Sequence, residues 1–398
     1  MPDYRDSIAK CSHCNFCQAT CPVYLEDILE THEPRARLEI IRRTLIEGSL
    51  SKSDRFKEIL DRCLLCTSCS RICPAGIPVH GIIAAARNMV YKGKRKNMAV
   101  RFLLRSIMER RGIHGVMGKV KNLAGSLGIK GDLPTPASRP FSEEYKGILE
   151  AEGERRARVV YYVGCATNSI YTDTGRDVLF VLRKNGIEVV LPAGLVCCGM
   201  PALGEGDLGT AREMMGKNLK ILSKLDFDAL VVECTSCGLM FRKDAAALFD
   251  EDDPLREQAE KVAAMTWEAT DYLEMIGMAA APAPLDLALT YHVPCHGWMT
   301  ESVKDAPRRL MEKIPGVKLI EMEHPERCCG AGGGFFMENP NLAESIRSRK
   351  IDEIERTTVK TVLTQCPGCR FFIQGPLENH RVVHPLSVLA RAYEIRGS

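Results

Sequence analysis

Eighteen cysteines dominate the chemistry that this sequence can perform. Two pairs of them are adjacent, and a glycine follows each pair at once: "AGLVCCGMPA" at residues 193–202 and "PERCCGAGGG" at residues 325–334. Neighbouring residues rarely form a disulfide without strain. In a reducing compartment, ordered cysteine spacings predict metal sites, because thiolates bind soft metals.

The first eight cysteines form two runs of the same spacing. "CSHCNFCQATCP" and "CLLCTSCSRICP" both show the C-x₂-C-x₂-C-x₃-C-P pattern of bacterial-type ferredoxins. Three thiolates in a short loop wrap one face of an iron–sulfur cube, so the fourth reaches the neighbouring cube. Zinc is the alternative, but it usually takes two ligands per loop, whereas each run offers four. We predict two [4Fe–4S] clusters, one held by Cys11, Cys14, Cys17 and Cys73, the other by Cys63, Cys66, Cys69 and Cys21.

The other ten cysteines divide into two matching sets of five. Three pairs of segments repeat at an offset of 130 to 132 residues, which indicates an internal duplication of residues 158–398. Five thiolates exceed what tetrahedral zinc needs, and consecutive residues are poor ligands for one regular cube. A cluster with a bridging thiolate would accept them. The sets are Cys165, Cys197, Cys198, Cys234 and Cys237 in the first copy, and Cys295, Cys328, Cys329, Cys366 and Cys369 in the second.

Apolar, β-branched runs predict the strands that position these cysteines. In each copy one strand ends at the single cysteine, a second leads to the adjacent pair, and a third reaches the CxxC motif, with helix-length segments between them. This alternation predicts a parallel sheet whose carboxyl edge gathers all five thiols of a copy. Between the ferredoxin-like runs, Leu38, Ile41 and Leu45 have helical spacing, and we expect that helix to stop near Gly48.

The fold class is therefore α/β: an N-terminal α-helical dicluster ferredoxin domain precedes a duplicated parallel α/β cysteine-rich domain. We expect the regions 1–90 (the ferredoxin-like domain), 91–157 (a basic helical segment and linker), 158–284 (the first copy) and 285–398 (the second copy). Residues 92–121 carry ten Lys or Arg against one acid. That segment fits a helix packed on the protein's own core, docking of an acidic partner, or contact with an anionic membrane.

The overall composition limits the classes of partner that this chain is expected to bind. A length of 398 residues suggests two or three domains, and a formal charge of only +3 argues against nucleic acid as a partner. We find neither a secretory signal nor eighteen consecutive apolar residues, and so expect a cytoplasmic chain, peripheral to the inner face of the membrane if residues 92–121 bind there.

The C-x₃₁₋₃₉-C-C-x₃₅₋₃₆-C-x₂-C pattern resembles the Cys-Cys-Gly domain of heterodisulfide reductases, and the ferredoxin pair makes the chain similar to their fused form. The resemblance implies a noncubane [4Fe–4S] cluster on each set of five, and two facing clusters that split a disulfide or thiol substrate between them. Because "GAGGGFF" has Phe335 where a dinucleotide motif needs glycine, the reductant must come from another protein. We expect an oxidoreductase that works within a larger complex, with a flavoprotein or other redox subunit as donor.

The same architecture also resembles the iron–sulfur subunits of glycolate oxidase, anaerobic glycerol-3-phosphate dehydrogenase and lactate-oxidising complexes, and it occurs in electron-bifurcating complexes. Those chains carry electrons from a flavoprotein toward a quinone or another carrier. Their first Cys-Cys-Gly copy is often incomplete, whereas both copies are complete here, which favours disulfide or thiol chemistry. A structural metal protein without redox chemistry is a third class.

His292 and His296 flank Cys295 in "YHVPCHGW" and are the candidate catalytic side chains. Near the cluster they would donate protons to leaving thiolates, as histidine does near neutral pH. The alternative is that they hydrogen-bond to sulfide or to the backbone.

Overall fold

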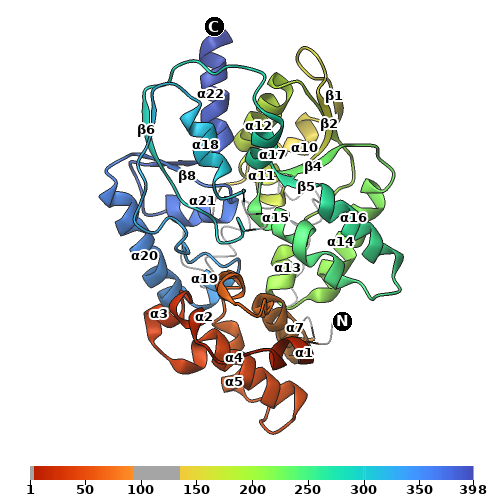
Figure 1. Ribbon diagram of the computed structural model, residues 1–398, viewed down its shortest axis with the longest axis vertical. Coiled ribbons are helices and arrows are strands. Elements are labelled where there is room, and N and C mark those ends of the chain that lie inside the picture. The colour runs from red at the N-terminus through yellow and green to blue at the C-terminus, as the bar shows by residue number, and fades with distance from the viewer. Residues whose placement is uncertain (1–3, 93–134, 299, 301, 398) are drawn as a thin grey trace.

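The computed structural model describes residues 4–92, 135–298, 300 and 302–397 (Figure 1). Most of the basic segment 92–121 and the start of the expected linker lie outside these ranges. Within them, no helix combines the length and the apolar character needed to cross a membrane.

Residues 4–92 form short helices, and no strand occurs among the described residues of this segment. Leu38 and Ile41 are buried as their spacing predicts, and a π-helical turn, Arg42–Ile46, follows before Gly48 takes φ +71°. The helices are α1 (Arg5–Ala9), α2 (Phe16–Ala19), α3 (Tyr24–Asp27), α4 (Pro34–Ile41), α5 (Asp54–Asp61), α6 (Ser68–Ile72) and α7 (Val79–Tyr91).

The first copy is built on a five-stranded sheet in the order β1-β3-β2-β4-β5. All neighbouring strands are parallel except β1, which pairs antiparallel with β3. The strands are β1 (Gly147–Leu149), β2 (Ala157–Tyr162), β3 (Ile187–Leu191), β4 (Ala229–Val232) and β5 (Thr266–Glu268). The helices are α10 (Phe141–Glu144), α11 (Cys165–Ser169), α12 (Thr172–Lys184), α13 (Met200–Gly204), α14 (Leu208–Leu222), α15 (Thr235–Leu239), α16 (Pro254–Met265) and α17 (Ala269–Ile276).

The second copy has a four-stranded parallel sheet in the order β7-β6-β8-β9, which repeats the order β3-β2-β4-β5. The prediction of a mixed α/β fold with parallel sheets is confirmed. The strands are β6 (Leu287–Tyr291), β7 (Val317–Leu319), β8 (Thr361–Leu363) and β9 (Arg381–Val383). The helices are α18 (Ala306–Glu312), α19 (Phe335–Glu338), α20 (Pro340–Arg356), α21 (Pro367–Gln374) and α22 (Pro385–Gly397).

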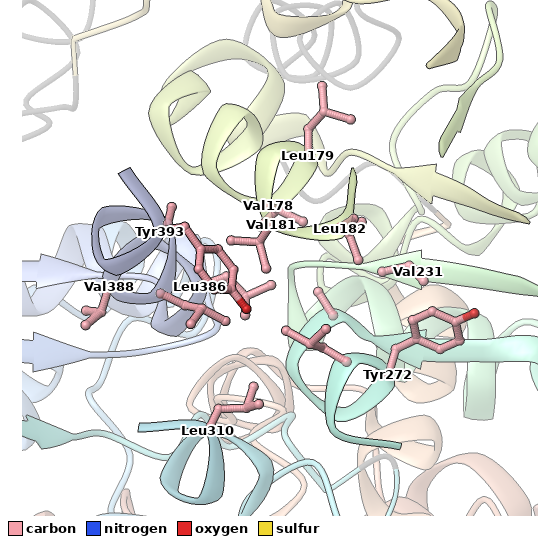
Figure 2. Packing of buried hydrophobic residues seen from close by; sticks show 14 of the residues in the cluster. Val178, Leu179, Val181, Leu182, Val231, Tyr272, Leu310, Leu386, Val388 and Tyr393 are labelled. Atoms are coloured by element: carbon pink, nitrogen blue, oxygen red, sulfur yellow. The ribbon is translucent and has the colours of Figure 1, made fainter. Parts of the chain in front are cut away.

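One hydrophobic core joins the two copies (Figure 2). Helix α12 places Val178, Val181 and Leu182 on one face, because these positions recur at helical spacing. Leu386 and Tyr393 of the C-terminal helix α22 pack against that face, so the last helix of the chain covers the first copy. The shared core therefore holds the two sheets in a fixed relation, and the helical segment 4–92 lies below both of them in Figure 1.

Candidate metal centres

All ten cysteines of the duplicated region line one cavity of about 240 Å³. Each cysteine follows the carboxyl end of a strand, as the parallel topology requires: Cys165 follows β2, for example, and Cys295 follows β6. A single water molecule needs only about 10–15 Å³, so the cavity has room for an inorganic group. The N-terminal segment also lines the cavity, through Leu64, and Phe335 of the second copy contributes as well. The cavity is therefore enclosed by the N-terminal segment and by both copies.

The ten thiols form one chain of contacts that is symmetric between the copies. In each copy the two adjacent thiols contact each other, and one of them also contacts the single cysteine while the other contacts the CxxC motif. The two CxxC motifs meet at the centre, where Cys234 contacts Cys366. The other contacts are Cys165–Cys197, Cys198–Cys237 and Cys234–Cys237 in the first copy, and Cys295–Cys328, Cys329–Cys369 (3.4 Å between Sγ atoms) and Cys366–Cys369 in the second.

In each five-cysteine set one thiol of the adjacent pair has a lowered pKa, which favours the binding of a cation. Hydrogen bonds from Cys197 and Cys237 lower the pKa of Cys198 to about 5. In the second copy, hydrogen bonds from Cys328 and Cys369 do the same for Cys329. Each copy thus offers a buried thiolate at neutral pH, and the thiolate is the form that binds metal.

The glycines after the paired cysteines are needed because of their surroundings. Gly199 and Gly330 have φ of +94° and +91°. A Cβ at Gly330 would lie 2.7 Å from the Ala343 carbonyl oxygen of α20, and one at Gly199 would lie 3.1 Å from the backbone of Ala211 in α14. The paired cysteines are therefore pressed onto the following helix.

The eight N-terminal cysteines line two smaller cavities. One is lined by Cys21, Cys63, Cys66 and Cys69, and the other by Cys11, Cys14, Cys17, Cys69 and Cys73. The structure thus brings the last cysteine of each run to the other run, as predicted for the two cubes. Cys69 borders both cavities, so the two sites are neighbours.

Buried groups around these cavities fit an iron–sulfur cluster. Burial raises the pKa of Cys66 to about 12, which a metal ion would offset by binding the thiolate. Arg37 of α4 is 2% exposed, and its Nη1 lies 3.9 Å from Cys21 Sγ. Its other contacts are the carbonyl oxygens of Ile59 and Arg62, and no carboxylate pairs with it within the described ranges. A buried cation needs a compensating anion, and a thiolate-ligated cluster provides one.

The N-terminal segment meets the second copy at Cys295. Thr67 Oγ1 donates to the Cys295 carbonyl oxygen at 3.1 Å. The pKa of the Cys295 thiol is raised, first by its hydrogen bond to Cys328 and then by its burial. Cys63 and Cys66 line both the 240 Å³ cavity and the adjoining smaller one. The three cavities therefore follow one another in space, and the smaller cavity that contains the exposed Cys14 lies at one end.

The two candidate catalytic histidines, His292 and His296, make different contacts in the structure. His296 bridges three parts of the chain, because its Nδ1 lies 2.9 Å from Ser236 Oγ and its Nε2 lies 3.0 Å from the Leu65 carbonyl oxygen. His292 is fully buried against Cys329 and Cys369. Burial lowers the pKa of His292 to about 3, so its imidazole is neutral at pH 7. Both histidines adjoin the ten-thiol site, and their catalytic role stays a prediction.

Sequence reasoning missed two features of these sites. Arg37 stands in a helix that the spacing predicted, but nothing in the sequence marks it as buried. Gly332 packs against Leu64 of the N-terminal segment, where a Cβ would lie 2.3 Å from Leu64 Cδ2. The run of glycines at 330–334 is the sequence feature that could have indicated this close contact, because glycine lets two chain segments approach closely.

Comparison with known proteins agrees with this geometry. The family model described as Cysteine-rich domain matches residues 159–242 and 289–374, and the 4Fe-4S dicluster domain matches residues 7–77. An uncharacterized iron-sulfur protein of Methanococcus maripaludis is 30% identical over 96% of this chain and 71% of its own length. A fumarate reductase (CoM/CoB) subunit of Methanothermobacter marburgensis is 28% identical over 98% of this chain and 74% of its own.

Two further likenesses extend over nearly the whole chain. A probable glycolate oxidase iron-sulfur subunit of Bacillus subtilis is 24% identical over 97% of this chain and 94% of its own. The crystal structure of a hypothetical protein from Helicobacter pylori shows a similar fold, with a TM-score of 0.58 at 10% identity over 97% of this chain and 72% of that chain.

The fold and the cysteine sites define an iron–sulfur protein. The chain belongs to the family of iron–sulfur proteins that join a 4Fe-4S dicluster domain to two Cysteine-rich domains, and its cofactors are [4Fe–4S] clusters.

Proposed function

We propose that this chain is the disulfide-reducing, electron-transferring subunit of an oxidoreductase complex of the heterodisulfide reductase type. The observation that supports this most strongly is the single cavity lined by two complete five-cysteine sets. The overall reaction takes a disulfide, two electrons and two protons to two thiols. When bound, two neighbouring clusters supply the two electrons one at a time.

On this proposal each cysteine set has its own task. The N-terminal region, residues 1–90, holds two cubane clusters on its two four-cysteine sets. The copies 158–284 and 285–398 each hold one noncubane cluster, with the adjacent pairs Cys197–Cys198 and Cys328–Cys329 supplying the extra thiolates. The contacts of each pair support this assignment, because both thiols line the same cavity although they follow each other in the chain.

The order of the cavities supports a direction of access. Cys14 is exposed and Phe16 beside it is 59% exposed, so a partner protein can reach this end. A flavoprotein or other redox subunit would dock there. The far end is the ten-thiol cavity, where His296 links both copies to the N-terminal segment and keeps the walls together.

Turnover with defined disulfides tests the proposal. The full chain, purified anaerobically and reduced with titanium(III) citrate, is mixed with the CoM/CoB heterodisulfide, glutathione disulfide or cystine, and the released thiols are counted. We expect at least one disulfide to yield two thiols per two electrons withdrawn. Cys198→Ser should abolish the reaction, whereas Ser223→Ala, on the exposed end of α14, should not. A fully loaded chain that leaves every disulfide intact would refute the proposal.

A second function is favoured by the likeness to the glycolate oxidase iron-sulfur subunit, which covers 94% of that protein. On that alternative the chain carries electrons from a flavin-dependent glycolate, lactate or glycerol-3-phosphate dehydrogenase, or within an electron-bifurcating complex, toward a quinone or another carrier. Oxidation of the reduced chain by a water-soluble quinone, with no response to disulfides, would select this alternative.

A further inference from the structure

His292 is a buried titratable side chain that lies against the second five-cysteine set. It directly follows β6 and is fully buried. A ring nitrogen of His292 and the sulfurs of Cys329 and Cys369 all lie within 4.8 Å of one another. The imidazole therefore lies beside these two thiols, although His292 does not itself line the ten-thiol cavity.

Neither ring nitrogen of His292 has a hydrogen-bond partner in the part of the chain that the structure describes. The Pro325 carbonyl oxygen lies near the ring and accepts the backbone N–H of Val293 at 2.9 Å, although a carbonyl oxygen can accept a second hydrogen bond. An unsatisfied buried polar group costs about 1–3 kcal/mol, so such groups usually have a partner. Besides this carbonyl, the acceptors beside the ring are the sulfurs of Cys329 and Cys369.

The first copy lacks this feature. By the offset of 130 residues, Tyr162 occupies the position that corresponds to His292. Its hydroxyl donates to the Val196 carbonyl oxygen at 2.6 Å and is thereby satisfied within the chain. The two copies share the ten-thiol cavity but differ at this position, where Tyr162 bonds to the backbone and His292 lies against two thiols.

We propose that His292 donates an N–H hydrogen bond to the iron–sulfur centre of the second copy and makes its reduction potential higher than that of the first. The inference rests on the proposed function, because it requires a cluster on each copy. Imidazole carries at least one N–H whichever tautomer is present. Hydrogen bonds to the sulfurs raise the potential of a cluster, since they stabilise the more negative, reduced state.

A difference in reduction potential between the two copies favours a two-electron reaction that proceeds one electron at a time. Both copies contact the N-terminal segment, the first through Asp244 and His80, and the second at a cysteine of its own set, through Cys295 and Thr67. A higher potential there retains the first electron beside the disulfide site until the second electron arrives. His292 is a positioning residue in this scheme.

The test compares His292→Phe, His292→Asn and Tyr162→Phe in the full chain after anaerobic cluster assembly. Iron content, pulsed EPR on ¹⁵N-histidine-labelled protein and EPR-monitored redox titration are measured for each. We expect a histidine nitrogen coupling in one centre of the wild type that is absent from His292→Phe. In that variant the potential of one centre should fall enough to change its reduced-to-oxidised ratio about tenfold, or about 59 mV.

The Asn variant retains an N–H donor and should keep most of the original potential, while Tyr162→Phe should leave both centres unchanged. If His292→Phe does not load iron, loss of the nitrogen coupling in the Asn variant decides the matter. Unchanged potentials or a persistent coupling at full iron content would overturn the inference and leave the proposed function standing. A wild type without iron on the second copy would overturn both.

Discussion

Replacing Arg37 by Met should lower the reduction potential of the cluster next to Cys21. Arg37 is 2% exposed, and its guanidinium lies 3.9 Å from Cys21 Sγ, so the charge acts in a poorly screened interior. Reduction adds negative charge to the cluster, which a nearby cation stabilises. Removing the cation therefore makes the reduced state less favourable.

The size of the shift follows from the geometry. Two unit charges 4 Å apart interact by about 4 kcal/mol at an effective dielectric constant of about 20. The added electron is spread over the cluster rather than placed on the Cys21 sulfur, so roughly half of that value, about 2 kcal/mol, is expected. For a one-electron couple this corresponds to a potential about 90 mV lower.

EPR-monitored redox titration of the anaerobic full chain measures this shift. Arg37→Lys keeps the charge and should recover most of the potential, although it gives up contacts to the Ile59 and Arg62 carbonyls. Arg43→Met removes a cation that is 53% exposed and paired with Glu39, and should have no effect. The reasoning is refuted if Arg37→Met keeps its iron and shifts the potential by less than about 20 mV, or if both Met variants shift it equally.

Three further changes test other parts of the structure. Cys329→Ser should remove about four of about sixteen irons and leave the N-terminal clusters intact in EPR; unchanged iron would contradict its role. Gly330→Ala should lower the free energy of unfolding, measured with denaturant under anaerobic conditions, by about 2–5 kcal/mol, because it adds a backbone clash to the left-handed strain. The control Gly333→Ala should cost about 1–2 kcal/mol, because its Cβ would meet no neighbour within 4 Å. Equal losses would exclude the clash. Glu268→Ala should cost about 1–3 kcal/mol in the same assay, because buried Glu268 accepts a hydrogen bond from Gln365 Nε2 at 2.7 Å. A loss under about 0.5 kcal/mol would show that the contact is dispensable.

The sequence predicted the features that repeat at fixed spacing. The cysteine runs repeat within the N-terminal segment. The strands β2, β3 and β4 of the first copy recur as β6, β7 and β8 of the second, so their alignment located the carboxyl edges where the thiols gather. The strands β1, β5 and β9 were not expected, because each has only three residues and no distinct periodic pattern.

Features that depend on tertiary contact escaped sequence analysis. Arg37 has the residue type and position of a solvated helix side chain, and only packing against α5 and Cys21 buries it. The pairing of Glu268 with His384, 3.4 Å apart, joins the ends of β5 and β9 across the two copies. Neither sheet alone contains both partners, so no local pattern could reveal the contact.

The iron and acid-labile sulfide content of the anaerobically purified chain tests the central claim most directly. If the ten thiols of the duplicated region hold two clusters in addition to the two on the N-terminal sets, we expect about sixteen irons and about sixteen sulfides per chain. About eight irons, with zinc or free thiols at the ten-cysteine cavity, would contradict it.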